Sequence, residues 1–365
     1  MRIAVDSRSL NVPHVRGMGR YLCSLLEAAD QQGRWEWELL SDRPDLPIHF
    51  PALRSARQMI FETRGWKFCT WEQWGLPRAT RRLRADVLFC PNTTLPWWQP
   101  IPAVVTVHDT IPWDSSEEKG HPFYWRRVMP RALQKAAAIV VPSACSQRDL
   151  AALWPVLEKK IHVIPHGLSE IWREEAGQPA PRELEELGIH GPYFLYVGGE
   201  IPRKRMEWAI KIFEQVTDDD CQLLLCGLNA ERRANIRQEL PASIADRVVA
   251  LPFVPEECMP RLVRQAVGVL YPTLYEGFGF PALEAQAVGT PILMSAVGSL
   301  AELCGPGAVV LPPEDLDAWI AACRELLADW KSDRAPNQAA RAWATSFSWQ
   351  ESARRHLELL QSVAV

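Results

Sequence analysis

The sequence predicts an α/β protein with two doubly wound domains that face each other across a cleft. Through both halves of the chain, short apolar runs alternate with segments of helical spacing, as buried parallel strands alternate with crossover helices. A charged, proline-containing segment with few apolar runs, residues 168–191, separates two such series. The length of 365 residues also favours two domains over one.

The first series is expected to form one parallel sheet. Its first strand is predicted at Ile3 to Val5, and helices are predicted at the segments PRALQKAA and SQRDLAALW. Further strands are predicted from apolar runs at residues 86–90, 103–109, 137–143 and 161–167.

The second series repeats this plan after the linker, with a helix predicted over residues 206–216. We place the two domains at residues 1–170 and 171–347. The segment WQESARRHLELLQ predicts a tail helix within about 348–365 that packs back on the first domain. The predicted strands of the second domain are residues 193–199, 222–227, 247–254, 267–272 and 291–295.

Composition limits the classes of function. The net charge of -4 excludes a globally basic nucleic-acid binder. No apolar run approaches the roughly 20 residues that cross a bilayer, and the start MRIAVDSRSL is too polar for a signal peptide. Nine scattered cysteines without a C-x-x-C pair indicate reduced thiols in a cytoplasmic protein.

One stretch, LYPTLYEGFGFPALEAQAVGTPILMS, carries the strongest chemical signal. It predicts a strand, a glycine loop, a short helix and a second strand, with Pro281 in the first helical turn and Gly289 just past the helix end. The loop then lies at the carboxyl end of a strand, where open α/β sheets bind ligands. Gly277 and Gly279 remove side chains from the loop, so that its backbone N–H groups can approach a ligand.

Backbone N–H groups beside a helix start form an anion site suited to phosphate. Two carboxylates, Glu276 before the loop and Glu284 after it, can bind hydroxyl groups on either side of that phosphate. A nucleotide sugar is a ligand of this kind, because its phosphates lie between two groups that carry several hydroxyls, the ribose and the sugar. The plain alternative is a tight turn with one exposed carboxylate and one carboxylate favoured by the helix dipole. We favour the functional interpretation for this motif in this context.

The residues from Glu276 to Pro281, together with Glu284, resemble the paired-glutamate signature of the family-four retaining glycosyltransferases, which have the GT-B fold. Other segments resemble the same family in the same order. They are the first glycine loop and helix, a histidine strand, the last strand before the linker and a basic donor-domain loop: GMGRYLCSLLEAA, VVTVHD, IHVIPHG and YVGGEIPRKR.

The resemblance implies roles in donor binding for the second domain. Glu284 would hold the ribose hydroxyls, and Glu276 would contact the transferred sugar. The amides of Phe278 to Phe280 would bind sugar hydroxyls or the diphosphate, and the base would lie near Phe253 and Val254. Arg203 and Lys204 would neutralise the leaving diphosphate, although a solvated basic turn is the alternative for these two.

The resemblance also implies roles for the first domain. Gly17 and Gly19 would let its loop approach the diphosphate. His108, at the end of a strand, would bind the transferred sugar rather than act as a strong base, while His166 is expected to be structural or part of a hinge.

The resemblance implies a retaining hexosyltransferase that uses a nucleoside-diphosphate sugar and needs no metal or other cofactor. A mannosyl donor, GDP-mannose, is favoured because YVG…PRKR resembles bacterial mannosyltransferases of cell-surface polysaccharide and lipopolysaccharide synthesis. The acceptor would be a glycan or a lipid-linked saccharide. Two alternatives stay open: a GT-B sugar-nucleotide epimerase, and a non-catalytic nucleotide-sugar-binding protein.

Other motifs give weaker evidence of function. The segment GMGRYL lacks the third glycine of a dinucleotide fingerprint, which argues against a dehydrogenase. The acidic triplets at 218–220 and 315–317 are expected to be a polar turn and a helix start rather than a metal site.

The segment 57–84 is rich in tryptophan and has seven Arg or Lys against two Glu. Tryptophans at 66, 71 and 74 among cations suit the inner face of a membrane, where indoles lie at the headgroup level. The alternative is a helix pair whose tryptophans pack inside the first domain.

Overall fold

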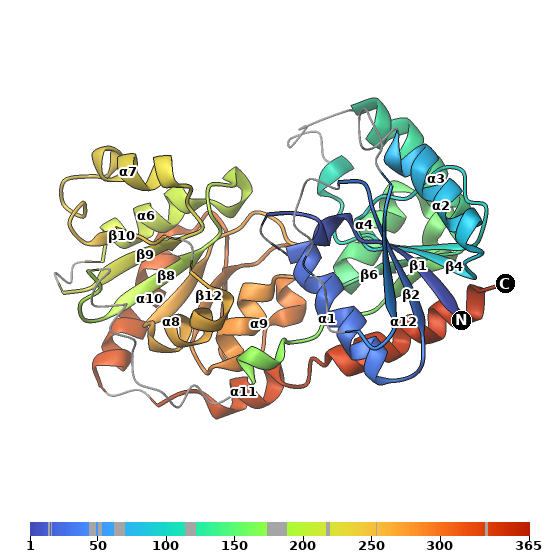
Figure 1. Cartoon of the computed structure of the whole chain (residues 1–365). Coiled ribbons are helices and arrows are strands. Elements are labelled where there is room, and N and C mark those ends of the chain that lie inside the picture. Colours follow the sequence, from blue (N-terminus) through green and yellow to red (C-terminus); the bar gives the residue numbers. More distant parts are fainter. Residues whose placement is uncertain are drawn as a thin grey trace. The chain divides into compact units, whose positions relative to one another are not determined.

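The computed structural model describes residues 1–13, 15, 17–43, 49, 53–61, 70–113, 122–173, 188–216, 220–252, 254–332 and 335–365. The chain divides into two compact units (Figure 1). Unit 1 comprises Met1–Gly167 and Ser348–Val365, and unit 2 comprises Leu168–Phe347. Within the described part of the chain, the helices are too short or too polar to span a bilayer.

Unit 1 contains a seven-stranded parallel sheet in the order β3-β2-β1-β4-β5-β6-β7. Four of its strands consist almost entirely of buried apolar residues, as expected for strands covered on both faces. The strands are β1 (Arg2–Asp6), β2 (Glu36–Ser41), β3 (Ala56–Ile60), β4 (Val87–Cys90), β5 (Ala103–Thr106), β6 (Ala138–Val141) and β7 (Ile161–Val163).

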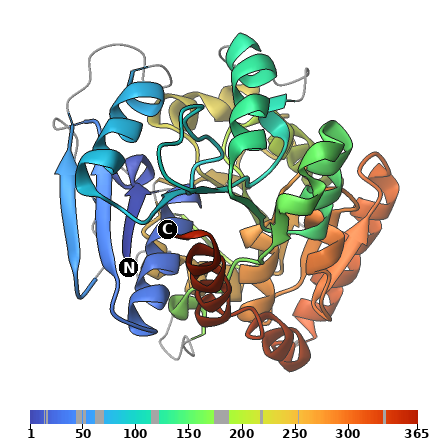
Figure 2. The ribbon, with the colours of Figure 1, turned by 90° about the vertical axis from the view of Figure 1, so that its right-hand side faces the viewer.

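The helices of unit 1 form two groups. One group, α2, α3 and α4, contributes to a single core cluster with the sheet. The other group consists of α1 and α12, which pack against each other. In Figures 1 and 2, α1 is blue and α12 is red. Their bounds are α1 (Gly17–Gln31), α2 (Leu76–Leu83), α3 (Met129–Lys135), α4 (Ala144–Leu153) and α12 (Trp349–Val363), with π-helical turns η2 (Trp71–Gly75) and η5 (Tyr124–Val128) before α2 and α3.

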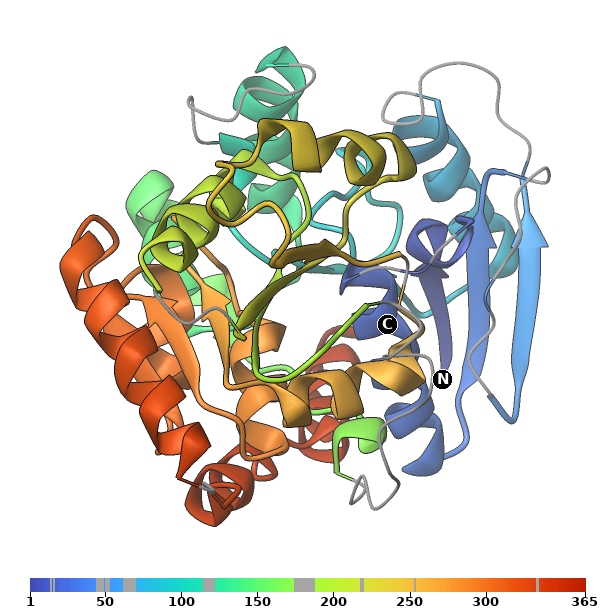
Figure 3. The same ribbon diagram turned by 90° about the vertical axis from the view of Figure 1, so that its left-hand side faces the viewer.

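Unit 2 contains a six-stranded parallel sheet in the order β10-β9-β8-β11-β12-β13, with its strands in yellow-green to orange in Figure 3. Its strands are β8 (Tyr193–Val197), β9 (Gln222–Cys226), β10 (Val248–Ala250), β11 (Gly268–Tyr271), β12 (Ile292–Ser295) and β13 (Ala308–Leu311). Its helices are α6 (Met206–Glu214), α7 (Ala230–Glu239), α8 (Met259–Gln265), α9 (Phe280–Ala287), α10 (Leu316–Lys331) and α11 (Gln338–Ala344).

The prediction of two parallel-sheet α/β domains is confirmed, and every predicted strand is present. The first strand extends one residue beyond its predicted bounds at each end, and the others are shorter than predicted. The interpretation of the tryptophan-rich segment as a helix pair packed inside the first domain agrees with the buried Trp71 and with the helical residues 71–83, but not with the start of the segment. Its start is not helical, because Arg57 to Ile60 belong to the edge strand β3. Most of β3 is only partly buried or exposed, so it lacks the apolar run from which strands were predicted.

Candidate functional site

The carboxyl ends of β8 and β11 lie side by side in unit 2. Strand order reverses between these two strands, since the chain runs outward from β8 to β10 and then returns to β11 on the other side. Such a reversal is where open α/β sheets bind ligands. The basic turn after β8 and the glycine loop after β11 therefore meet at the same edge.

The glycine loop has the predicted backbone. Gly279 has φ 104°, and a Cβ added there would lie 2.5 Å from Leu300 Cδ2. Helix α9 begins at the next residue with Pro281 in its first turn. Gly289, with φ 76°, follows the helix end. Only glycine satisfies both the left-handed conformation and the close packing at position 279.

The Glu276 carboxylate is held by the two predicted cations. Arg203 Nη1 lies 2.9 Å from Glu276 Oε1, and Lys204 Nζ donates to the same oxygen. All three side chains are largely buried, with exposed fractions of 14% for each cation and 11% for the glutamate. The structure thus brings together three residues that are about seventy positions apart in the sequence.

Two further residues, Tyr271 and Thr273, position this cluster, and the sequence analysis missed both. Lys204 Nζ donates to the Tyr271 hydroxyl at 2.9 Å and lies 4.9 Å from the centre of its ring. Thr273 Oγ1 donates to Glu276 Oε1 at 3.0 Å. Their place at the end of β11 was the available signal, because side chains there point to the ligand edge of the sheet.

The backbone of Glu276 is fixed by the segment after β12. Its carbonyl oxygen accepts a hydrogen bond of 3.0 Å from Ser299 N. Gly298 has φ 55°, and a Cβ there would lie 2.6 Å from the same oxygen. The main chain at Glu276 is therefore held in place, and this positions its side chain in the cluster.

Electrostatics keep Glu276 ionised. Burial alone would raise the pKa of Glu276, but the charges of Lys204 and Arg203 outweigh it and lower the pKa. Burial, followed by the charge of Glu276, raises the pKa of Tyr271 well above its usual value, so its hydroxyl stays protonated. One anion and two cations leave the cluster with a net charge of about +1, which suits an anionic ligand.

The turn that carries the cations is unusual. Arg203 and Lys204 lie in a short 3-10 turn that ends at Arg205, a non-glycine residue with φ 55°. Arg205 itself points elsewhere, donating to Pro313 O and packing 4.1 Å from the Trp208 ring centre. A left-handed non-glycine residue is a strained conformation that is often found at binding sites.

Most of the remaining predicted donor residues of unit 2 lie in the same loop or on the helix after it. Glu284 is buried on α9, with an exposed fraction of 7%. Gly277 is buried, and the Phe278 and Phe280 rings pack against each other at 5.3 Å in or beside the core. Of the two residues expected near the base, Val254 is partly buried against that core, and Phe253 lies outside the described residues.

In unit 1, the predicted glycine loop is already helical. Gly17 is the first residue of α1, with no atom within 4 Å of an added Cβ. Gly19 lies within α1, where a Cβ would be 2.7 Å from Ser9 O. Close packing within unit 1 is therefore sufficient to explain Gly19, whereas Gly17 borders open space.

His108 follows β5 and carries no charge at neutral pH. Its Nε2 lies 2.7 Å from Pro91 O, so Nε2 carries the proton and donates it, and Nδ1 is unprotonated. Burial lowers the pKa of His108 to about 4. The ring packs 4.8 Å from Tyr21 and 5.5 Å from His166, which is itself buried against Trp349. His108 is therefore neutral and hydrogen-bonded within unit 1, and its contact with a transferred sugar stays a prediction.

A buried hydrogen-bond chain fixes the tail helix to unit 1. The Tyr21 hydroxyl lies 2.8 Å from Thr106 Oγ1 and 3.0 Å from His356 Nε2. His356 Nδ1 lies 2.7 Å from Ser352 O, so Nδ1 donates and Nε2 accepts from Tyr21. The chain joins α1, β5 and α12. Gly167 faces the start of α12 so closely that a Cβ would lie 2.2 Å from Trp349 N.

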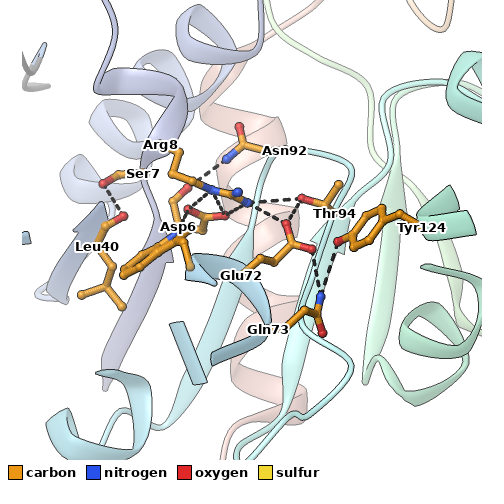
Figure 4. A network of polar contacts seen from close by, with 10 residues as sticks. Asp6, Ser7, Arg8, Leu40, Glu72, Gln73, Asn92, Thr94 and Tyr124 are labelled. Carbon is orange, nitrogen blue, oxygen red and sulfur yellow. Dashed lines mark hydrogen bonds and ion pairs between the residues drawn. The ribbon is translucent and has the colours of Figure 1, made fainter. Parts of the chain in front are cut away.

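A second charged network lies at the strand-order reversal of unit 1, between β1 and β4 (Figure 4). Arg8 Nη2 lies 2.6 Å from Asp6 Oδ2 and 2.8 Å from Glu72 Oε2, and both carboxylates are fully buried. Thr94 Oγ1 donates to Glu72. Burial would lower the pKa of Arg8, but the charges of Asp6 and Glu72 raise it. The sequence analysis missed this network, whose members look unremarkable one by one.

The acidic triplets do not form a metal site in the part that the structure describes. Asp315 caps α10, where its Oδ1 accepts from Ala318 N at 3.0 Å. Asp218 and Asp219 lie outside the described residues. Among the described residues, no group of three or more His, Cys, Asp and Glu side chains is placed to hold a metal ion.

Comparison with known proteins agrees with this arrangement. The model for glycosyltransferase family 4 matches residues 15–170, and that for glycosyl transferases group 1 matches residues 191–329. The O-antigen chain mannosyltransferase B of Escherichia coli is 28% identical over 68% of this chain and 67% of its own length. The matched parts span about 60% to 67% of the first relatives found.

Solved structures share the fold of the whole chain. A sucrose-phosphate synthase from Thermosynechococcus elongatus has a TM-score of 0.76 at 22% identity, covering 99% of this chain and 98% of that one. The Anabaena protein HepE in complex with UDP and glucose has a TM-score of 0.75 at 16% identity, covering 99% and 100%. The resemblance seen in the motifs is confirmed: the chain belongs to the glycosyltransferases of family 4 and group 1, with the GT-B fold.

Proposed function

We propose that this protein is a retaining glycosyltransferase that moves a hexose from a nucleoside-diphosphate sugar to a glycan or lipid-linked saccharide. The observation that supports it best is the buried cluster of Arg203, Lys204 and Glu276 beside the glycine loop. The cluster carries a net positive charge, and the start of α9 adds backbone N–H groups. A diphosphate beside a sugar is the ligand that this combination suits.

The proposed chemistry is a substitution on one face of the sugar. The bond between the anomeric carbon and the diphosphate oxygen breaks as the acceptor hydroxyl attacks from the same side. The departing phosphate oxygen accepts the acceptor's proton, and the new glycosidic bond retains the anomeric configuration. Arg203 and Lys204 stabilise the charge that builds on the diphosphate. Neutral His108 and ionised Glu276 bind sugar hydroxyls.

A mannosyl donor, GDP-mannose, is the preferred substrate in this proposal, and cell-surface polysaccharide synthesis is the preferred process. The similarity to an O-antigen mannosyltransferase supports both. The protein would act in the cytoplasm, at the periphery of the membrane that holds a lipid-linked acceptor.

The test is a thermal-shift screen of nucleoside diphosphates and their sugars, followed by incubation of the best donor with and without a glycolipid extract. We expect stabilisation by one nucleoside diphosphate and its sugars, because a ligand of the native state raises the melting temperature. Sugar transfer should require the extract, and NMR should show a retained anomer. Conversion of the donor without extract would indicate an epimerase, and binding without any turnover would indicate a binding protein.

Replacement of Glu276 and of Glu284 by glutamine is expected to change different kinetic constants. Glu284 would hold the ribose in both the ground and transition states, so Glu284→Gln should mainly raise KM for the donor, by about tenfold. Glu276 pairs with Arg203 and Lys204, the cations proposed to stabilise the departing diphosphate, so Glu276→Gln should mainly lower kcat. Steady-state kinetics separate the two effects. Equal, mild changes in both constants for both variants would contradict these assignments.

Catalysis is also expected to need no divalent metal, because fixed cations and backbone N–H groups supply the charge compensation that Mg²⁺ otherwise provides. Exhaustive chelation should leave activity within about twofold of its starting value. Activity that is abolished by the chelator and restored by Mg²⁺ or Mn²⁺ would overturn this expectation and direct attention to Asp218, Asp219 and Asp220.

A further inference from the structure

Four large aromatic side chains stand exposed on unit 1. Trp74, Trp97, Trp98 and Phe123 have exposed fractions of 59%, 50%, 40% and 73%. By contrast Trp71, in the same π-helical turn as Trp74, is fully buried in the core. A folded domain usually covers side chains of this size unless another surface contacts them.

Two rows of residues bring these aromatic rings together with cations. One row runs from Trp74 through Arg78 to Arg82 along η2 and α2, with Arg78 Nη1 donating to Trp74 O at 3.2 Å. The other row runs along η5 and α3 from Phe123 to Lys135. Within it, Arg131 Nη1 donates to Arg127 O at 2.7 Å. Residues spaced by about four share a helix face.

The segment after β4 joins the two rows. The Arg78 guanidinium lies 4.8 Å from the Trp74 ring centre and 5.9 Å from that of Trp98. Lys135 Nζ lies 4.4 Å from the Trp97 ring centre. Backbone contacts fix this segment, because Trp97 N donates to Gln73 Oε1 at 2.8 Å. Because adjacent Trp97 and Trp98 each contact a cation of a different row, the two rows are joined into one surface, called here the aromatic–basic surface.

The charge of this surface is opposite to that of the chain. In residues 71–84, 95–101 and 122–135 the only carboxylate is Glu72, which is fully buried and paired with Arg8. The chain as a whole has a net charge of -4. The exposed cations of the aromatic–basic surface are Arg78, Arg81, Arg82, Arg84, Arg126, Arg127, Arg131 and Lys135.

We propose that the aromatic–basic surface docks unit 1 onto an anionic lipid bilayer. Indole rings lie at the headgroup level of membranes, and basic residues beside them attract anionic lipids. A surface for neutral glycan would instead present carboxylates and amides to sugar hydroxyls, and exposed carboxylates are absent from the described residues of these segments. The proposal concerns unit 1 alone and does not depend on the donor site.

The surface differs from the segment that the sequence suggested. Arg57 lies in the edge strand β3, and Trp71 is a core residue. Trp66 lies outside the described residues. The residues around Phe123 and Lys135 had no part in the sequence hypothesis, because they are far from 57–84 in the chain.

The experiment is sedimentation with phosphatidylcholine vesicles that contain or lack phosphatidylglycerol. Each basic residue near an anionic surface is worth roughly fivefold in affinity, so Arg78→Gln with Arg131→Gln should weaken binding about 10- to 30-fold. Trp97→Ala with Trp98→Ala should weaken it at least about tenfold. Added salt should weaken binding of the wild type and reduce the difference between wild type and the arginine variant.

Matched variants on other surfaces serve as controls. Lys159→Gln with Lys211→Gln removes the same charge from exposed positions, and Leu153→Ala with Val156→Ala removes exposed apolar groups. Both should bind as the wild type does, and circular dichroism should show that all variants are folded. Equal binding to neutral vesicles, no binding by the wild type, or binding indifferent to the test variants would overturn the proposal. Tight binding to a soluble anionic polysaccharide without vesicle binding would assign the surface to a glycan.

Discussion

Replacing Lys204 with alanine is expected to lower kcat/KM for sugar transfer by about 100- to 1000-fold. The Lys204 ammonium is held in place by Glu276 and by the Tyr271 hydroxyl, so it needs no reorganisation when charge develops on the departing diphosphate. Losing one preorganised donor to developing charge costs about this much in other enzymes. The measurement is the initial rate of transfer with the donor found by the thermal-shift screen.

Two companion variants make this result interpretable. Lys204→Arg keeps the charge and should recover part of the activity, whereas Lys211→Ala removes an exposed cation from α6 and should leave the rate unchanged. Removing Lys204 also leaves Glu276 with Arg203 alone, so the melting temperature of each variant is needed. A folded Lys204→Ala protein with activity within a few-fold of wild type would show that the diphosphate is held elsewhere.

Unit 1 is expected to lose several kcal/mol of stability as the pH falls from about 6.5 to about 4. Burial lowers the pKa of both His108 and His356 to about 4, and lowers that of His166 too. Over this range the unfolded chain binds protons that the folded unit excludes, so stability is present above pH 6.5 and is lost on acidification. One histidine shifted by this much accounts for about 3 kcal/mol.

Hydrogen exchange of α1 and α12, followed as a function of pH, measures this loss in unit 1 alone. His356→Gln should reduce the slope by about one proton, whereas replacing the exposed His190 of unit 2 by glutamine should not change it. Protection that stays constant between pH 7 and pH 4.5 would show that these histidines are protonated without unfolding.

The fold was largely predictable because its buried parallel strands are apolar along their whole length. Of the three missed strands, β2 and β3 differ in that respect, while β13 is an apolar run of only four residues that is mostly not fully buried. Glu36 and Glu38 interrupt β2, and β3 is an exposed edge. Glu38 is tolerated inside because Arg2 lies 3.7 Å away, a pairing that becomes visible only when the sheet is assembled.

The candidate site was predictable in its parts but not in its contacts. Glycines and glutamates of the loop have fixed spacing, and their chemistry can be interpreted locally. The pairing of Glu276 with Arg203 and Lys204 depends on β8 and β11 being neighbours in the sheet, which no local pattern encodes. Ser299, whose hydroxyl donates to Glu276 O at 2.9 Å, was missed because a hydroxyl carries no signal until its acceptor is known.

The position of α12 has a consequence for biosynthesis. Helix α1 leaves the ribosome before unit 2, yet the helix that packs against it, α12, is translated after all of unit 2. Until then the Tyr21 hydroxyl lacks His356, and the side of α1 that meets α12 has no neighbour. Although domains made first usually fold first, unit 1 can be completed only after unit 2 and α12 have been translated, while unit 2 can fold earlier. A nascent chain of this protein therefore exposes an incomplete unit 1, on which a chaperone can act, throughout the synthesis of unit 2.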